Sequence, residues 1–174
     1  MSGGREVEVV VTWLEMAERP GGPFPPLPAG APVSLLRAVG APNGWFLHLY
    51  DLAGEDHFWL DRHKDDAETL QAFVQHEDVS IFALMWNGWP GGLMALDWRA
   101  PGVCDLAYLG LGKPLRGRAL GPWLLGEALR MGWSREGVTR MSVNTCTLDH
   151  PKALGLYQRA GFRPVRRSTV RQVL

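Results

Sequence analysis

Residues 109–125 read LGLGKPLRGRALGPWLL, and the interpretation of the 174-residue chain starts from this stretch. It joins an apolar, strand-like run to an amphipathic helix through a basic turn that contains glycine. Backbone N–H groups at the start of a helix attract anions, and neighbouring arginines favour phosphate in particular. The stretch therefore predicts a phosphate site between a strand and a helix.

Two common nucleotide-binding motifs do not fit this turn. A P-loop requires Gly-Lys followed by Ser or Thr, whereas Gly112-Lys113 is followed by Pro114. The dinucleotide-binding fingerprint requires a third Gly or Ala, and this chain has Leu115 there. The turn fits a different pattern, Arg/Gln-x-x-Gly/Ala-x-Gly/Ala, whose positions are occupied by Arg116, Ala119 and Gly121.

The hydrophobic pattern on both sides of the turn indicates an α+β fold, with a mixed sheet and helices packed on it, in one domain over residues 1–174. Residues 33–53 are predicted to form a helix or two short helical turns. The stretch 20–32 has six prolines and three glycines and is predicted to be a surface loop. The predicted strands are 5–13, 79–86, 93–98, 103–111, 140–145 and 164–173, and the predicted helices are 65–75, 122–135 and 151–160.

A second pattern follows the turn in the chain. Ala153, Tyr157, Gly161 and Phe162 make an Ala-x-x-x-Tyr-x-x-x-Gly-Phe series. The two patterns in this order resemble the GNAT N-acetyltransferase superfamily. The resemblance covers residues 79–165 well, and residues 1–78 only by the order of elements.

The resemblance implies a GNAT-like fold in which strands 103–111 and 140–145 are parallel neighbours that splay apart. It also implies acetyl-CoA as co-substrate, with its pantetheine arm in the gap and its pyrophosphate on the turn. Where relatives usually have Gly in the turn this chain has Ala119, which restricts φ and is expected to weaken phosphate binding. The expected cofactor contacts are Leu109, Gly110, Leu111, Arg116, Gly117, Arg118, Ala119, Leu120, Gly121 and Asn144.

The resemblance also implies direct acyl transfer to an amine, with Tyr157 as the acid that protonates the thiolate. Asp105 takes the position where many relatives carry a Glu base, and it is expected to act through water from the same strand face as Ala107 and Leu109. His150 is an alternative base, since its unperturbed pKa is about 6.5. Cys146, four residues before His150, is not needed as a nucleophile, because direct transfer does not require one.

Charge is divided unevenly along the chain. Residues 1–112 hold six basic and fifteen acidic residues, and residues 113–174 hold twelve basic and three acidic ones. This division suggests an anionic ligand on the C-terminal part and a cationic small-molecule amine at the acidic N-terminal part. The tryptophans of that part that would frame a cationic or aromatic amine are Trp45, Trp59, Trp86 and Trp89. The alternative is that the two parts attract each other or a second copy.

Several other classes of protein and site are not expected. Cys104 and Cys146 are expected to be reduced thiols of a cytoplasmic protein. No metal site is expected, because His57, Asp61 and His63 lack a fourth ligand. No membrane partner is expected, because no apolar run approaches a membrane span.

No nucleic-acid partner is expected either, since the overall charge is neutral and no reader element is recognisable. The last strand is a possible homodimer edge. The rival to an enzyme is an inactive GNAT-like module that binds coenzyme A as a sensor or interaction domain.

Overall fold

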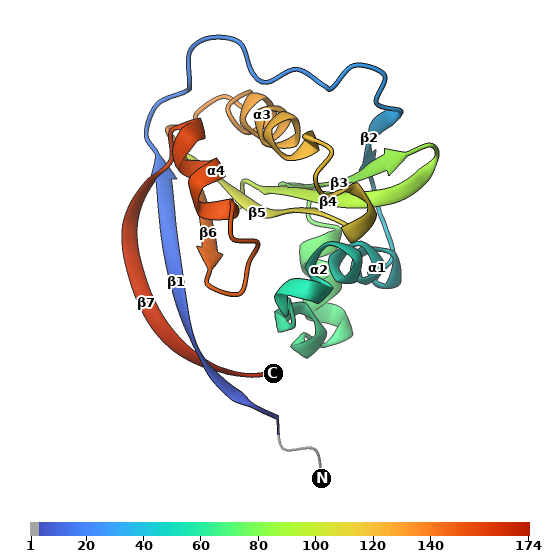
Figure 1. Ribbon diagram of the computed structural model, residues 1–174, viewed down its shortest axis with the longest axis vertical. Helices are drawn as coiled ribbons and strands as arrows, with labels where there is room; N and C mark the ends of the chain where they lie inside the picture. Colours follow the sequence, from blue (N-terminus) through green and yellow to red (C-terminus); the bar gives the residue numbers. More distant parts are fainter. Residues whose placement is uncertain (1–3) are drawn as a thin grey trace.

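The computed structural model describes residues 4–174, which form one seven-stranded sheet in the order β2-β3-β4-β5-β6-β1-β7 (Figure 1). All neighbouring strands are antiparallel except β5 and β6. The strands are β1 (Glu6–Met16), β2 (Val33–Ala38), β3 (Val79–Trp86), β4 (Trp89–Asp97), β5 (Val103–Leu111), β6 (Arg140–Cys146) and β7 (Arg163–Val173). The helices are α1 (Asn43–Gly54), α2 (Ala67–Val74), α3 (Leu120–Gly132) and α4 (Ala153–Ala160), with the short 3-10 helices η1 (Glu55–His57), η2 (Asp61–Lys64) and η3 (Lys113–Leu115).

Helices cover both faces of the sheet and make two apolar cores. On one face, α3 and α4 pack on side chains such as Leu96, Leu106 and Val143. On the other face, α1 and α2 pack on residues such as Ile81 and Leu93. Figure 1 shows the two helix pairs on opposite sides of the strands. The predicted mixed sheet flanked by helices is therefore confirmed.

The hairpin between β3 and β4 follows directly from its two turn residues. Asn87 and Gly88 both have positive φ, 47° and 83°, as the tight two-residue hairpin turns require. Trp86 is paired with Trp89, so β4 begins immediately after the turn.

The prediction of helix over the start of residues 33–53 is wrong. Residues Val33–Ala38 form β2, which pairs antiparallel with β3 at one edge of the sheet. An edge strand is partly exposed on both faces, so its side chains lack the strict alternation that identifies a half-buried strand. The helical prediction holds for α1, where Phe46, Leu49 and Tyr50 are buried.

The parallel neighbours β5 and β6 separate soon after they begin. They pair only from Val103 to Asp105, opposite Arg140 to Ser142. Beyond that point β5 contains a bulge, because Leu96 pairs with Leu106 and Ala95 with Tyr108, which leaves Ala107 unpaired. The prediction of two splayed parallel strands is confirmed.

The proline-rich stretch 20–32 passes over α3 (Figure 1). There the Cβ of Phe24 lies 3.1 Å from the position that a Cβ on Gly126 would take.

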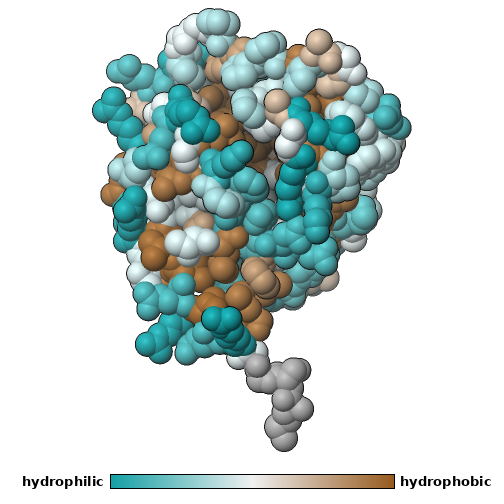
Figure 2. All heavy atoms as spheres, viewed as in Figure 1, coloured by the Kyte–Doolittle hydropathy of each residue, from teal (hydrophilic) through white to brown (hydrophobic). Residues whose placement is uncertain are grey.

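Strand β7 lies at one edge of the sheet. Figure 2 shows apolar residues over β1 and β7, and Val170 and Val173 of β7 are exposed. That this strand is a homodimer edge stays a prediction.

Candidate functional site

A cavity of about 410 Å³ occupies the gap between β5 and β6. One wall comes from α3 and α4, and the opposite wall from α1, η1 and the residues that follow it. Its volume falls within the range of small-molecule sites, about 300–1,000 Å³. It extends without a break from the start of α3 to Tyr157, Leu106 and Val143.

The start of α3 offers backbone donors to this cavity. Ala119 precedes the first residue of the helix with φ 59° and ψ 24°, and Gly117 has φ 75°. Within residues 4–174, the N–H groups of Gly117 to Gly121 donate to no other backbone group. The positive end of the helix dipole adds to their attraction for an anion. No acidic side chain lies in the first turn of α3 to occupy the site.

Most of the predicted cofactor contacts are gathered at this cavity, and Arg118 is the exception. The side chain of Arg118 donates from Nε to the Pro114 carbonyl at 3.1 Å and covers the ring of Trp86 at 4.9 Å. The contacts that line the cavity are Leu109, Gly110, Leu111, Arg116, Gly117, Ala119, Leu120, Gly121 and Asn144.

Arg116 lines the cavity and also connects β5 to η1 through hydrogen bonds. Its Nε donates to the Leu111 carbonyl at 3.1 Å, and its Nη1 donates to Asp56 Oδ2 on η1 at 2.7 Å. The hydrogen bond from Arg116 holds the pKa of Asp56 below its usual range. The guanidinium therefore has a carboxylate partner already, and a phosphate at this place would compete with Asp56.

Because Ala119 has a left-handed backbone conformation, its replacement by glycine is expected to stabilise the protein. An alanine in this region is strained by about 1–2 kcal/mol, whereas glycine is not. Ala119→Gly is expected to raise the free energy of unfolding by up to about 1 kcal/mol. Glycine removes the backbone strain of the native state, and it also increases the entropy of the unfolded chain, which offsets part of the gain. Ala72→Gly, at an exposed position inside α2, is the control and is expected to lower it by about 1 kcal/mol. Urea denaturation of both variants checks this, and equal losses would show that Ala119 is unstrained.

Tyr157 lies on α4 in the cavity wall, with 7% of its surface exposed. Its ring packs edge-on against Phe162 at a centroid distance of 5.9 Å. Burial, followed by the charge of Asp149, raises the pKa of Tyr157 above its usual value. The hydroxyl is therefore protonated over the whole range in which enzymes work, as a proton donor requires.

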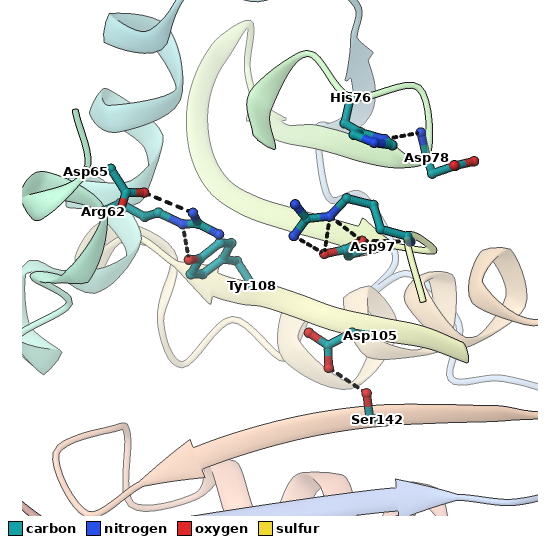
Figure 3. Close-up of polar contacts among 9 residues, drawn as sticks. Arg62, Asp65, His76, Asp78, Asp97, Asp105, Tyr108 and Ser142 are labelled. Carbon is teal, nitrogen blue, oxygen red and sulfur yellow. Dashed lines mark hydrogen bonds and ion pairs between the residues drawn. The ribbon is translucent and has the colours of Figure 1, made fainter. Parts of the chain in front are cut away.

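Asp105 lies at the closed end of the gap and does not line the cavity. It accepts a hydrogen bond of 2.6 Å from Ser142 Oγ on β6, as Figure 3 shows. Burial raises the pKa of its carboxyl. The expectation that Asp105 and Leu109 share a strand face is wrong, because the bulge at Ala107 changes the alternation. Leu109 packs with the core under α3, whereas Tyr108 packs with the core under α1.

One residue of the site, Asp149, was not expected from the sequence, and neither was its contact with Trp59. Asp149 accepts from Thr145 Oγ1 and from the Cys146 N–H, both at 2.8 Å, and from Trp59 Nε1 at 3.0 Å. The sequence does place Asp149 before a helix, in the run that carries the second pattern, but it carries no signal that Trp59 lies opposite. The indole of Trp59 crosses from the α1 side to reach it.

His57 and His150 both line the cavity, with ring centroids 6.1 Å apart. His57 Nδ1 lies 3.2 Å from the Leu148 carbonyl, which fixes its ring. Burial, followed by the electrostatic effects of its neighbours His57 and Arg116, lowers the pKa of His150. His150 is therefore neutral at pH 7.

The residues considered as metal ligands, His57, Asp61 and His63, do not form a cluster. His63 contacts Asp51, and Asp61 contacts Lys64. Within residues 4–174 no group of three or more His, Cys, Asp or Glu side chains is placed to hold a metal ion. In the same range no helix is both long and apolar enough to cross a membrane.

Some of the opposite charges of the two parts of the chain pair with each other within the molecule. Ion pairs join acidic residues of the N-terminal part to arginines of the C-terminal part, namely Asp56 with Arg116, Asp78 with Arg135, Glu15 with Arg140 and Glu6 with Arg171. Lys113 and Lys152, near the start of α3 and of α4, form no ion pair within residues 4–174, and Lys152 lines the cavity. Within the described residues, the positive charge of Lys152 thus remains in the cavity wall without an acidic partner.

The sequence of residues 46–162 matches the model of a protein family described as the Acetyltransferase (GNAT) family. A search of curated proteins finds no match to the chain. The sequence match includes the cavity, α3 and α4.

Solved structures with the same fold share little sequence with the chain. A GNAT-family acetyltransferase from Novosphingobium aromaticivorans is 16% identical, with 97% of this chain and 66% of that chain covered and a TM-score of 0.58. A tandem GNAT protein from the clavulanic acid biosynthesis pathway is 16% identical, with 99% and 56% covered and a TM-score of 0.61.

An aminoglycoside acetyltransferase from an uncultured soil metagenomic sample is 15% identical, with 74% and 87% covered and a TM-score of 0.58. The chain thus spans about half to two thirds of the length of several proteins that it matches nearly from end to end. These similarities establish the fold.

Proposed function

Because the chain belongs to the acetyltransferase (GNAT) family, we propose that it transfers an acetyl group from acetyl-CoA directly to an amine of a small molecule. One observation carries this proposal. A single cavity joins the free N–H groups at the start of α3 to the Tyr157 wall, through the gap between β5 and β6.

The residues of the cavity fit the parts of acetyl-CoA in order. The N–H groups of Gly117 to Gly121 and the charge of Lys152 would hold the pyrophosphate. The separated edges of β5 and β6 leave backbone groups that would pair with the amide groups of pantetheine, near Leu109 to Leu111. Acetyl-CoA supplies the activated thioester, and the protein supplies its position.

The chemistry requires three contributions from the protein. A base takes a proton from the amine, because only the neutral form attacks the carbonyl carbon. Backbone N–H groups near Leu109 stabilise the oxyanion, and the bulge at Ala107 frees further backbone groups there. As the C–N bond forms and the C–S bond breaks, the Tyr157 hydroxyl gives its proton to the sulfur.

Asp105 is proposed as the base, acting through water. Its carboxyl lies at the closed end of the gap, and a raised pKa makes its carboxylate a stronger proton acceptor than an exposed one. Asn144 and Thr145 line the cavity next to β6 and would order the water. The acidic N-terminal part supports a cationic amine as the acceptor.

The proposal is tested by binding first and turnover second. An excess of acetyl-CoA is expected to raise the melting temperature, because a ligand that binds only the native state stabilises it. A broad panel of amines is then assayed by the release of the free thiol of coenzyme A. No thermal shift would refute the cofactor assignment.

A module that binds coenzyme A without transferring an acyl group is the second candidate. The position of Asp105 outside the cavity favours it, because this carboxylate does not reach the amine directly. A thermal shift together with no turnover of any amine would support this candidate over the enzyme.

A further inference from the structure

The indole of Trp59 bridges the gap between β5 and β6 on the side of α1. At one end, its Nε1 donates to Asp149 Oδ1, just beyond β6, at 3.0 Å. At the other end, its Cη2 lies 3.2 Å from the position that a Cβ on Gly110 of β5 would take. The ring also lines the cavity, so it forms part of the wall opposite α4.

The ring fits into a recess that small residues make for it. A Cβ on Gly54 would overlap Cδ2 of the indole, so only glycine leaves room there. The Cβ of Ala53 lies 2.8 Å from the position of a Cβ on Gly110, so the recess is narrow on that side too. Because these neighbours are small, removal of the indole would leave a space that opens into the cavity.

The surroundings also hold the ring in one orientation. The rings of Tyr50 and Tyr108 both lie 5.6 Å from that of Trp59, centroid to centroid. Its hydrogen-bond partner Asp149 is itself fixed by Thr145 and by the N–H of Cys146. Trp59 is therefore a rigid wall of the cavity.

The acyl group would point toward this wall. On the proposed mechanism, the thioester sulfur lies beside the Tyr157 hydroxyl on the α4 wall. Asp149, which holds Trp59, lines the same cavity as Tyr157. An acyl chain that leaves the thioester across the gap therefore meets the indole.

We propose that Trp59 determines acyl-chain specificity by limiting the acyl group to short chains. The inference rests on the proposed function, since it assumes that acyl-CoA binds in this cavity. In a hydrophobic pocket, one extra or missing methylene group changes specificity by about 10–200-fold. A side chain that blocks the longer acyl chains is expected to discriminate against them by a factor of this order.

The experiment measures dissociation constants by calorimetry for coenzyme A, acetyl-CoA, butyryl-CoA and hexanoyl-CoA, without an amine. Wild type is expected to bind hexanoyl-CoA at least about tenfold more weakly than acetyl-CoA. Trp59→Ala and Trp59→Leu are expected to reduce this ratio to below about threefold, while affinity for coenzyme A itself changes little. Two variants are used because the leucine retains more of the packing in the recess.

Phe58→Ala is the matched control. Phe58 is the neighbouring aromatic residue, is 42% exposed and does not line the cavity, so this variant is expected to keep the wild-type ratio. An unchanged ratio in a folded Trp59→Leu, or equal binding of acetyl-CoA and hexanoyl-CoA by wild type, would overturn the inference alone. A wild type that does not bind coenzyme A would overturn the proposed function, and this inference with it.

Discussion

Gly121→Asp is expected to weaken the binding of coenzyme A by about 100-fold or more while the protein stays folded. Gly121 is in the first turn of α3 and lines the cavity. A carboxylate there would face the pyrophosphate, and like charges about 4 Å apart repel by about 1 kcal/mol in water and about 4 kcal/mol at an effective dielectric constant of 20. Between these limits, a loss of about two orders of magnitude in affinity follows.

The fold should tolerate this change. A Cβ on Gly121 would meet only Leu156 Cδ2, at an ordinary contact distance of 3.9 Å. A negative side chain in the first turn of a helix is stabilising, by about 0.3–1 kcal/mol. The melting temperature without ligand is therefore expected to stay the same or rise.

Gly121→Asn separates charge from size, because asparagine has nearly the same shape as aspartate. Calorimetry with coenzyme A is expected to show a loss of less than about tenfold for Gly121→Asn. If both variants lose affinity equally, the free N–H groups at the start of α3 do not bind the pyrophosphate.

Tyr157→Phe is expected to lower turnover by about 10–100-fold, slightly below the usual general-acid contribution because a thiolate is already a fair leaving group. The change keeps the buried ring and its contact with Phe162 but removes the hydroxyl. Affinity for coenzyme A and the melting temperature should change little. Because the pKa of Tyr157 is raised above its usual value of about 10, turnover by wild type should not fall up to about pH 9 through loss of this proton.

Tyr50→Phe provides the control for deleting a buried phenol hydroxyl. Tyr50 is also buried, and its hydroxyl accepts from the Arg62 N–H at 3.4 Å, but it does not line the cavity. Its turnover is expected to equal that of wild type. A folded Tyr157→Phe with unchanged turnover would make Tyr157 a packing residue. A large fall in stability with a proportional loss of activity would instead indicate a buried hydrogen bond.

The features that depend on consecutive residues could be predicted from the sequence. The turn at Arg116 to Gly121, the helix that carries Tyr157 and the Asn87-Gly88 hairpin are each made by neighbours in the chain, so local propensity and spacing identify them. The two motifs also carry the resemblance to the GNAT superfamily, and that resemblance implies the splayed parallel strands, which the structure shows.

Two other features depended on contacts between distant segments. Residues 33–38 became strand rather than helix because the edge of β3 offers them backbone partners. The bulge at Ala107 turns Tyr108 toward α1 and Leu109 toward α3, and nothing in the apolar run Val103–Leu111 signals one extra residue. One unpaired residue on β5 therefore decides which side chains face the site.

The wall of the site on the α1 side was decided by tertiary structure alone. Arg116 meets Asp56 across 60 positions, and Trp59 meets Asp149 across 90. Such pairs leave no periodicity in the sequence, because each partner belongs to a different local element. The sequence by itself determined where an anion and a proton donor are expected, whereas packing of α1 and η1 against the gap decided which side chains enclose them.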